Sequence, residues 1–262
     1  MGKIIALTNQ KGGVGKTTTA VNLAAALGAQ GMQVLLVDID PQGNATSGLG
    51  INKRGVVNSS YQLIMGSKKL DECVLKTPFD NVAIVPSSID LAGAELELVE
   101  LERREYKLRD ALLQYKRYFD FILLDCPPSL GLLTLNGLNA ADSILIPIQC
   151  EYYALEGLSQ LMSSVRSVKR LYNPSIEVEG VLVTMYDARL NLTGQVVDEV
   201  KRFFPQKVFA TVIPRNVRLS EAPSFGKPIR YYDGGSKGSQ AYDDLAAEVI
   251  ANNRRLLEKE EE

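Results

Sequence analysis

The sequence contains no histidine among its 262 residues. This absence excludes catalysis by Ser-His or Cys-His pairs and metal binding through imidazole. Only three cysteines are present, Cys73, Cys126 and Cys150, and no two of them form a CxxC pair. A disulfide framework or a structural zinc site is therefore not expected, and a reducing cytoplasm suits this composition. Any chemistry must use carboxylates, lysines, main-chain amides or a bound ion.

The sequence also lacks long apolar runs and a strong net charge. No run approaches the roughly 20 residues that a membrane-spanning helix needs, and no signal peptide is visible before the apolar residues 4–7. The net charge is −2, so binding to an acidic polymer would require a local basic surface. With 45% hydrophobic residues, we expect one domain over residues 1–257 and an acidic tail at 258–262.

Short apolar runs alternate with helical patterns along the chain. Several runs are apolar at every position, which indicates strands covered on both faces. Helical periodicity is clear at residues 153–172 and 239–257. The alternation predicts an α/β fold with a doubly wound, mostly parallel β-sheet of about seven or eight strands, flanked by helices. The expected strands are residues 4–8, 34–37, 82–85, 121–124, 144–148, 181–185 and 208–213.

A segment rich in glycine and lysine follows the first expected strand and opens a helix. It reads Lys11-Gly12-Gly13-Val14-Gly15-Lys16-Thr17-Thr18. Glycines allow main-chain amides to turn toward phosphate oxygens, and the helix N-terminus adds a positive dipole. We expect Lys16 to reach the β- and γ-phosphates of a nucleotide and the Thr17 hydroxyl to bind Mg²⁺. Gln10 replaces the usual first glycine of such a loop, and an additional lysine, Lys11, stands beside it.

Acidic residues follow two of the other expected strands. Asp38 and Asp40 come directly after residues 34–37, and Asp125 follows residues 121–124. The carboxyl edge of a parallel sheet is where such folds bind ligands, and strand alternation places Asp38 and Asp40 on one face. We expect Asp125 to hold Mg²⁺ through water, because this ion retains much of its hydration in proteins. Taken alone, Asp38 and Asp40 are equally typical of a turn.

The loop KGGVGKTT at residues 11–18 resembles the deviant Walker A motif of the ParA/MinD family of P-loop ATPases. The likeness extends over nearly the whole chain and is greatest to the short chromosomal Soj type. It implies an ATP-dependent homodimer in which Lys11 of one subunit reaches the nucleotide of the other. It also implies that Asp40 is the catalytic aspartate, supported by Asp38, and that ATP is hydrolysed slowly to ADP and phosphate. The residues implied to bind Mg²⁺ are Thr17, Asp40 and Asp125.

The resemblance assigns two further surfaces. By resemblance, Pro214 and Asn216 contact adenine. Residues 165–230 carry eleven basic and six acidic side chains; family members bind double-stranded DNA non-specifically through such a surface, and Arg189 and Arg218 match their DNA contacts. No helix-turn-helix is visible, which favours phosphate contacts over base readout. A solvated surface of mixed charge is the other interpretation.

The implied function is partitioning of a chromosome or plasmid, in the cytoplasm and on the nucleoid, with hydrolysis stimulated by a ParB partner. A MinD-like membrane-associated positioning ATPase is the alternative. It needs a basic amphipathic C-terminal helix, whereas residues 254–257 run into an acidic end, so stable membrane binding is not expected. An electron carrier like the nitrogenase iron protein would need a second cysteine beside Cys126. A binding module without catalysis would not need Asp40.

Overall fold

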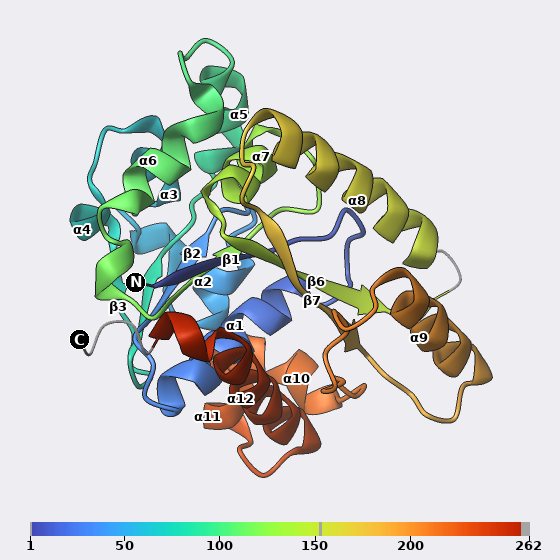
Figure 1. Cartoon of the computed structure of the whole chain (residues 1–262). Coiled ribbons are helices and arrows are strands. Elements are labelled where there is room, and N and C mark those ends of the chain that lie inside the picture. Colours follow the sequence, from blue (N-terminus) through green and yellow to red (C-terminus); the bar gives the residue numbers. More distant parts are fainter. Residues whose placement is uncertain (1, 152–153, 258–262) are drawn as a thin grey trace.

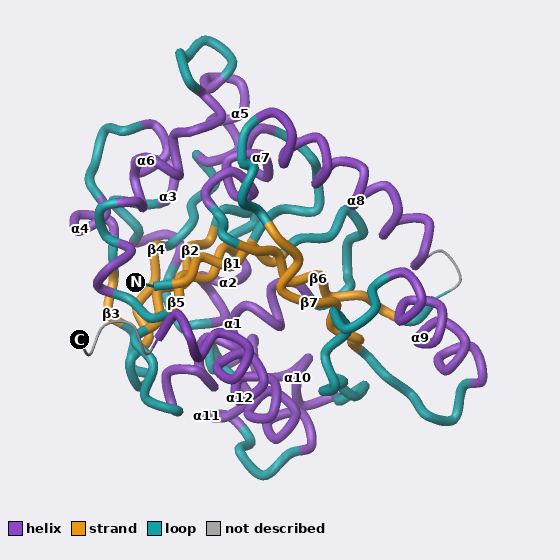
Figure 2. Tube along the Cα trace, in the orientation of Figure 1, coloured by secondary structure: helices purple, strands orange, loops and turns teal. Residues whose placement is uncertain are grey.

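The computed structural model describes residues 2–151 and 154–257, which form a central β-sheet with helices on both faces (Figures 1 and 2). The described residues build a seven-stranded sheet in the order β3-β4-β2-β5-β1-β6-β7. Every neighbouring pair is parallel except β3 and β4. The expected mostly parallel α/β fold is therefore confirmed. The strands are β1 (Lys3–Leu7), β2 (Val34–Asp38), β3 (Leu75–Lys76), β4 (Val82–Val85), β5 (Phe121–Asp125), β6 (Ser143–Gln149) and β7 (Glu177–Thr184).

The helices connect the strands and cover the sheet on both sides. In chain order they are α1 (Lys16–Ala29), α2 (Asn44–Gly48), α3 (Ser60–Met65), α4 (Leu70–Cys73), α5 (Leu91–Leu98), α6 (Lys107–Leu113), α7 (Leu132–Ala140), α8 (Ala154–Leu171), α9 (Asn191–Phe203), α10 (Val217–Glu221), α11 (Ile229–Tyr232) and α12 (Lys237–Leu257). The helices α8 and α12 confirm the two clearest helical patterns. The expected start of the first at residue 153, and the tail at 258–262, lie outside the described residues.

Alternate residues of the parallel strands enter two separate cores. Ile4 and Ala6 of β1 pack with side chains from α3 and α5–α9 on one face. Ile5 and Leu7 pack with α1, α2 and α10–α12 on the other, and Figure 1 shows these two helical layers. This arrangement explains why the strands are apolar at consecutive positions, since neither face of the sheet meets water.

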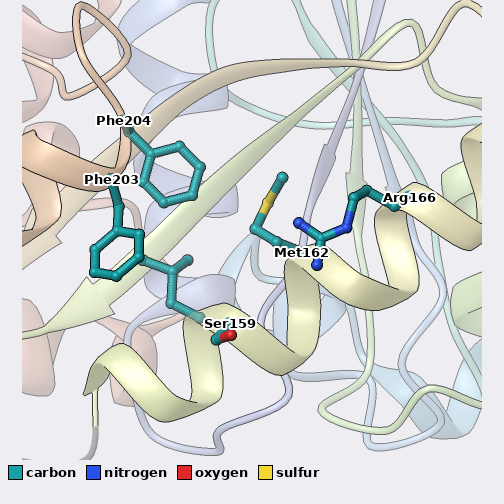
Figure 3. Close-up of a pocket in the computed structure, with 6 residues that line it drawn as sticks. Ser159, Met162, Arg166, Phe203 and Phe204 are labelled. Carbon is teal, nitrogen blue, oxygen red and sulfur yellow. The ribbon is translucent and has the colours of Figure 1, made fainter.

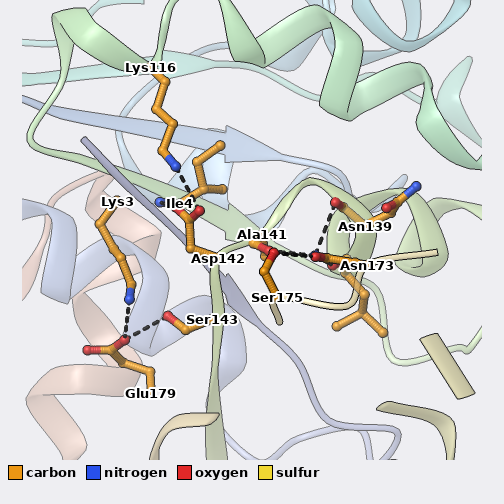
Figure 4. Close-up of polar contacts among 11 residues, drawn as sticks. Lys3, Ile4, Lys116, Asn139, Ala141, Asp142, Ser143, Asn173, Ser175 and Glu179 are labelled. Carbon is orange, nitrogen blue, oxygen red and sulfur yellow. Dashed lines mark hydrogen bonds and ion pairs between the residues drawn. The ribbon is translucent and has the colours of Figure 1, made fainter. Parts of the chain in front are cut away.

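Buried polar contacts hold the layers together at the amino ends of the strands (Figure 4). The Asp142 carboxylate accepts hydrogen bonds from the Ile4 N–H at 2.8 Å and the Lys116 ammonium at 2.7 Å. The Asn173 amide donates to main-chain carbonyls at the C-terminal end of α7. These contacts fix one edge of the sheet and leave the carboxyl edge to the loops of the candidate site.

The segment at 208–213, which the sequence predicts to be a strand, is not part of the sheet. Val208 makes only an isolated parallel bridge with β7. The Glu248 carboxylate of α12 accepts the N–H groups of Ala210 and Thr211 at 2.8 and 3.1 Å. Because a side chain satisfies these two donors, the ladder does not continue. The sheet instead gains the antiparallel strand β3, which the sequence pattern did not indicate.

Candidate functional site

The loops after β1, β2 and β5 meet at the carboxyl edge of the sheet. In the parallel register, Asp125 at the end of β5 lies between Leu7 of β1 and Asp38 of β2. The glycine-rich loop follows β1, and Asp40 lies two residues beyond the end of β2. The fold therefore brings together three motifs that span more than 100 residues of the sequence.

The glycine-rich loop has a conformation that exposes main-chain amides. Gly13 and Gly15 have φ angles of 75° and 86°, in the left-handed region that favours glycine. Gly15 is the N-cap of α1, and no side chain caps that helix. The first N–H groups of α1 are thus available to an anion, together with the positive end of the helix dipole.

Two residues that the sequence analysis did not single out fix this loop to the sheet. The Thr184 hydroxyl lies 2.8 Å from the Val14 carbonyl oxygen and 2.9 Å from a carbonyl oxygen of β6. The Asn9 amide donates to another carbonyl of β6 at 2.8 Å, and its oxygen accepts the Lys11 N–H at 3.0 Å. Asn9 follows β1 and Thr184 ends β7, both at the carboxyl edge of the sheet. This position after an apolar run is the feature of the sequence that could have indicated them.

The two lysines of the loop have different surroundings. Lys16 is 6% exposed, and its ammonium donates to the Lys11 carbonyl at 3.0 Å. Burial lowers the pKa of Lys16, while the nearby carboxylates of Asp125 and Asp40 act in the opposite direction. The Lys11 ammonium forms a hydrogen-bonded ion pair with Glu151, and both side chains are partly exposed. Lys16 is therefore a buried cation at the loop, and Lys11 is held at its rim.

Asp125 is wholly buried, and neither of its carboxylate oxygens has a hydrogen-bond partner among the described residues. Burial raises its pKa well above the ordinary range, and the charge of Asp38 raises it further. The Thr17 hydroxyl, which lies close to the carboxylate without a well-formed hydrogen bond, and the charge of Lys16 oppose this shift. An unpartnered buried carboxylate is costly unless a cation or a donor reaches it. Asp125 beside Thr17 therefore fits a hydrated Mg²⁺ ion, whose ligands are oxygen atoms.

Asp38 and Asp40 are both buried at the end of β2. Burial raises the pKa of Asp38 to about 6, although its carboxylate accepts hydrogen bonds from Thr46 and from the Asp40 N–H. The Asp40 carboxylate accepts the Gln42 N–H at 2.9 Å. Asp38 is thus fully engaged by protein groups, whereas one Asp40 oxygen accepts no hydrogen bond from the described residues and is better placed to act on a ligand.

A cavity of about 300 Å³ connects the loop with the segment expected to contact adenine. Gly15 and Thr18 lie on its wall, opposite Pro214 and Asn216. The Asn216 side-chain oxygen accepts the Arg218 N–H at 2.8 Å as the N-cap of α10. Its amide NH₂ group remains as a donor toward a base. The full lining is Gly15, Thr18, Thr184, Met185, Ile213, Pro214, Arg215, Asn216, Leu219, Ser220, Pro223 and Tyr242.

A second cavity, of about 200 Å³, lies between α8 and α9 (Figure 3). Met162 and Arg166 of α8 line it together with Phe203 and Phe204. It contains no carboxylate and none of the predicted nucleotide contacts. This cavity is therefore separate from the residues predicted to bind a nucleotide.

The two arginines expected to contact DNA lie outside the nucleotide cavity, and both are paired. The Arg189 guanidinium makes two hydrogen bonds to Asp187, at 2.9 and 2.7 Å, and holds the pKa of that carboxyl at about 2. Arg218 lies 2.9 Å from Glu221 and 3.5 Å from Asp233. A phosphate that binds either arginine must compete with these carboxylates.

Comparison with known proteins identifies the family. Residues 2–178 match the AAA domain family. The chain is 59% identical to the sporulation initiation inhibitor protein Soj of Bacillus subtilis over 96% of this chain and 100% of that relative. This chain belongs to the ParA/Soj family. It is also 53% identical to the chromosome partitioning protein ParA of Myxococcus xanthus, over 95% of this chain and 88% of that one.

Among solved structures, this ParA-family chain is similar to cobyrinic acid a,c-diamide synthase from Mycobacterium smegmatis with bound ADP and magnesium. The TM-score is 0.85 at 37% identity, over 97% of this chain and 96% of that one. The partitioning relatives share more of the sequence than the synthase does. The described residues include no helix that is long and apolar enough to cross a membrane.

Proposed function

We propose that this ParA-family ATPase is an ATP-switched dimer that partitions a chromosome or plasmid. In this proposal it hydrolyses ATP slowly, binds double-stranded DNA non-specifically as the ATP dimer, and is stimulated by a ParB-type partner. It acts in the cytoplasm, on the nucleoid. The observation that supports it is the meeting of the phosphate loop, Asp40 and Asp125 at one sheet edge, in a chain 59% identical to Soj.

The residues of the site divide the chemistry between binding and hydrolysis. The amides of residues 12–18 and the Lys16 ammonium bind the phosphates, and Asn216 and Pro214 hold the base. Thr17, Asp40 and Asp125 would hold Mg²⁺, which neutralises charge on the phosphate oxygens when bound. Asp40 orients the attacking water and accepts its proton.

Dimerisation would supply the last cation of the site. In one copy of the chain, Lys11 is paired with Glu151 at the rim of the loop. We propose that Lys11 leaves this carboxylate and reaches the transferring phosphoryl group bound to a second copy. A cation delivered in trans stabilises charge that develops in the transition state. Hydrolysis is then slow in the isolated chain, and the ATP dimer persists long enough to bind DNA.

The proposed DNA surface includes Arg189 and Arg218, which a dimer presents twice. Their ion pairs with carboxylates are exposed and therefore weak, so phosphate groups can replace them. Contacts of this kind release counterions and carry no base information. We expect affinity that is independent of DNA sequence and falls as salt concentration rises.

The decisive measurement is DNA binding by the purified protein with ATP, with ADP and without nucleotide, across a salt series. We expect binding with ATP and Mg²⁺ only, with an affinity that decreases linearly on a log–log plot against salt. Arg189→Glu should lose DNA binding and keep ATP binding. If the protein fails to bind DNA with ATP, with ADP and without nucleotide, the partitioning function is contradicted. ATP-dependent binding to anionic lipid vesicles would then favour a MinD-like positioning ATPase.

A further inference from the structure

A closed ring of hydrogen bonds surrounds the main chain of Asp40. The Asp38 carboxylate accepts the Asp40 N–H at 3.2 Å and the Thr46 hydroxyl and N–H at 2.7 and 2.8 Å. The Thr46 hydroxyl oxygen accepts the Ser87 N–H at 2.8 Å. The Ser87 hydroxyl donates to the Asp40 carbonyl at 2.7 Å and closes the ring. Asp38, Thr46 and Ser87 are completely buried.

The ring joins three separate segments of the fold. Asp38 ends β2, Thr46 lies in α2, and Ser87 follows β4. The direction of each bond is defined, because the Thr46 hydroxyl has one proton to donate and uses it on Asp38, which leaves its oxygen to accept from Ser87. Both polar groups of the Asp40 main chain are held, one at each side of its Cα atom. The ring therefore fixes the direction in which the Asp40 side chain leaves the backbone.

We infer that Thr46 and Ser87 are positioning residues for ATP hydrolysis, which act by holding the Asp40 main chain in register with the phosphate loop. This inference rests on the proposed function, in which Asp40 orients the attacking water. Catalytic groups must be held within about 0.5 Å of the productive position, and a misplacement of about 1 Å can cost roughly a hundredfold in rate. Neither residue touches the nucleotide in this account, so substrate binding does not depend on them.

The test is steady-state ATP hydrolysis by full-length variants with Mg²⁺. Ser87→Ala removes the hydroxyl bond to the Asp40 carbonyl, which then keeps the Gly43 N–H at 2.9 Å, and the variant retains the Ser87 N–H. We expect kcat to fall about tenfold while KM for ATP stays within about twofold of wild type. The matched control is Ser60→Ala: the Ser60 hydroxyl is also buried, but it has no hydrogen-bond partner among the described residues. That variant should keep both constants.

A second pair of variants tests the ring at Thr46. Thr46→Val removes the hydroxyl at nearly constant volume and should lower kcat at least as much as Ser87→Ala. Thr46→Ser keeps the hydroxyl and should restore kcat to within about threefold of wild type. Rescue by the serine separates positioning from packing, because the serine loses the methyl group and keeps the hydrogen bonds.

The possible outcomes distinguish a failure of the positioning role from a failure of the proposed ATPase function. A wild-type protein without Mg²⁺-dependent turnover would overturn the proposed function and the inference with it. Wild-type turnover combined with an unchanged kcat in Ser87→Ala and Thr46→Val would overturn the inference alone. A rise in KM equal to the loss in kcat/KM would also overturn it, since the ring would then act on ATP binding. Thermal unfolding of each variant shows that the assays are made on folded protein.

Discussion

At the scale of single residues, the site places acidic side chains close together in the buried part of the sheet. Asp38 and Asp125 are neighbours in the register of β2 and β5, and both are fully buried. The protein supplies Asp38 with three hydrogen bonds, whereas neither oxygen of Asp125 accepts a hydrogen bond within residues 2–151 and 154–257. The free energy of unfolding of the ligand-free protein is lowered by this arrangement, which is the kind of cost that functional sites carry.

This cost gives a prediction for Asp125→Asn, measured without nucleotide or Mg²⁺. Burial raises the pKa of Asp125 above its ordinary value of 3.8. The contribution of the Asp125 carboxyl group to the free energy of unfolding is therefore fully present below pH 3.8 and is lost as pH rises. The asparagine carries no charge, so we expect it to raise the free energy of unfolding by about 1–2 kcal/mol at pH 7. The gain should shrink toward pH 4. Chemical denaturation at both pH values measures it.

The same variant should lose Mg²⁺-dependent ATP hydrolysis, so stability and activity change in opposite directions. Asp120→Asn is a suitable control, since Asp120 lies at the amino end of β5 and its carboxylate accepts the Gln33 N–H at 2.7 Å. If Asp125→Asn is less stable than wild type at pH 7, the Asp125 carboxylate does not destabilise the folded protein.

At the scale of elements, the connection between α9 and α10 forms one wall of the cavity beside the glycine-rich loop. Its backbone touches β7 at separate points, where the Phe209 N–H donates to Val181 and the Ile213 N–H to Val183. Phe209 packs over Gly180, where an added Cβ atom would lie 2.4 Å from the aromatic ring. Glycine at this position therefore lets the connection lie close to the sheet and carry Pro214 to the phosphate loop.

We predict that Gly180→Ala lowers the free energy of unfolding by about 1–3 kcal/mol, because the new methyl group displaces the Phe209 ring. Gly157→Ala in α8 is the matched control, since an added Cβ atom there meets nothing within 4 Å. That control should be neutral or slightly stabilising through helix propensity. Urea denaturation measures the free energy of unfolding of both variants. If Gly180→Ala is as stable as wild type, the Phe209 ring has room to move.

At the scale of the whole molecule, one copy of the chain holds Lys11 in a resting arrangement. Its partner Glu151 lies 140 residues away in the sequence, at the end of β6. The pair is partly exposed, so it contributes little to folding and can exchange for a phosphate. Binding of ATP can thus draw Lys11 into an interface between two copies without any cost to the core.

We predict that Lys11→Ala binds ATP but does not dimerise with it, because Lys16 and the loop amides remain intact while the cation delivered in trans is lost. Light scattering after size-exclusion chromatography, with and without ATP, measures the change. Lys76→Ala is the control, since Lys76 lies on the edge strand β3. An ATP-dependent dimer of Lys11→Ala, as abundant as that of wild type, would remove Lys11 from the interface.

Local sequence patterns predicted the glycine-rich loop at residues 11–18, the acidic strand ends and the alternation that gives a parallel α/β sheet. These features are local: positive φ at glycine, apolar runs and a charge directly after a strand can be recognised within a few residues. The other six predicted strands agree with the structure to within four residues at each end, whereas 208–213 is not a strand and β3 was not predicted.

Which distant groups meet depends on how the whole chain packs. This packing placed Glu248 against the main chain at 210–211, so that a run with a strand-like pattern became a loop. It also brought Ser87 to the Asp40 carbonyl and Thr46 to Asp38, and left the Asp125 carboxylate without a hydrogen bond from the described residues. These contacts join residues tens of positions apart, and no local pattern specifies them. Packing of the whole chain sets which polar groups are satisfied and which remain for a ligand.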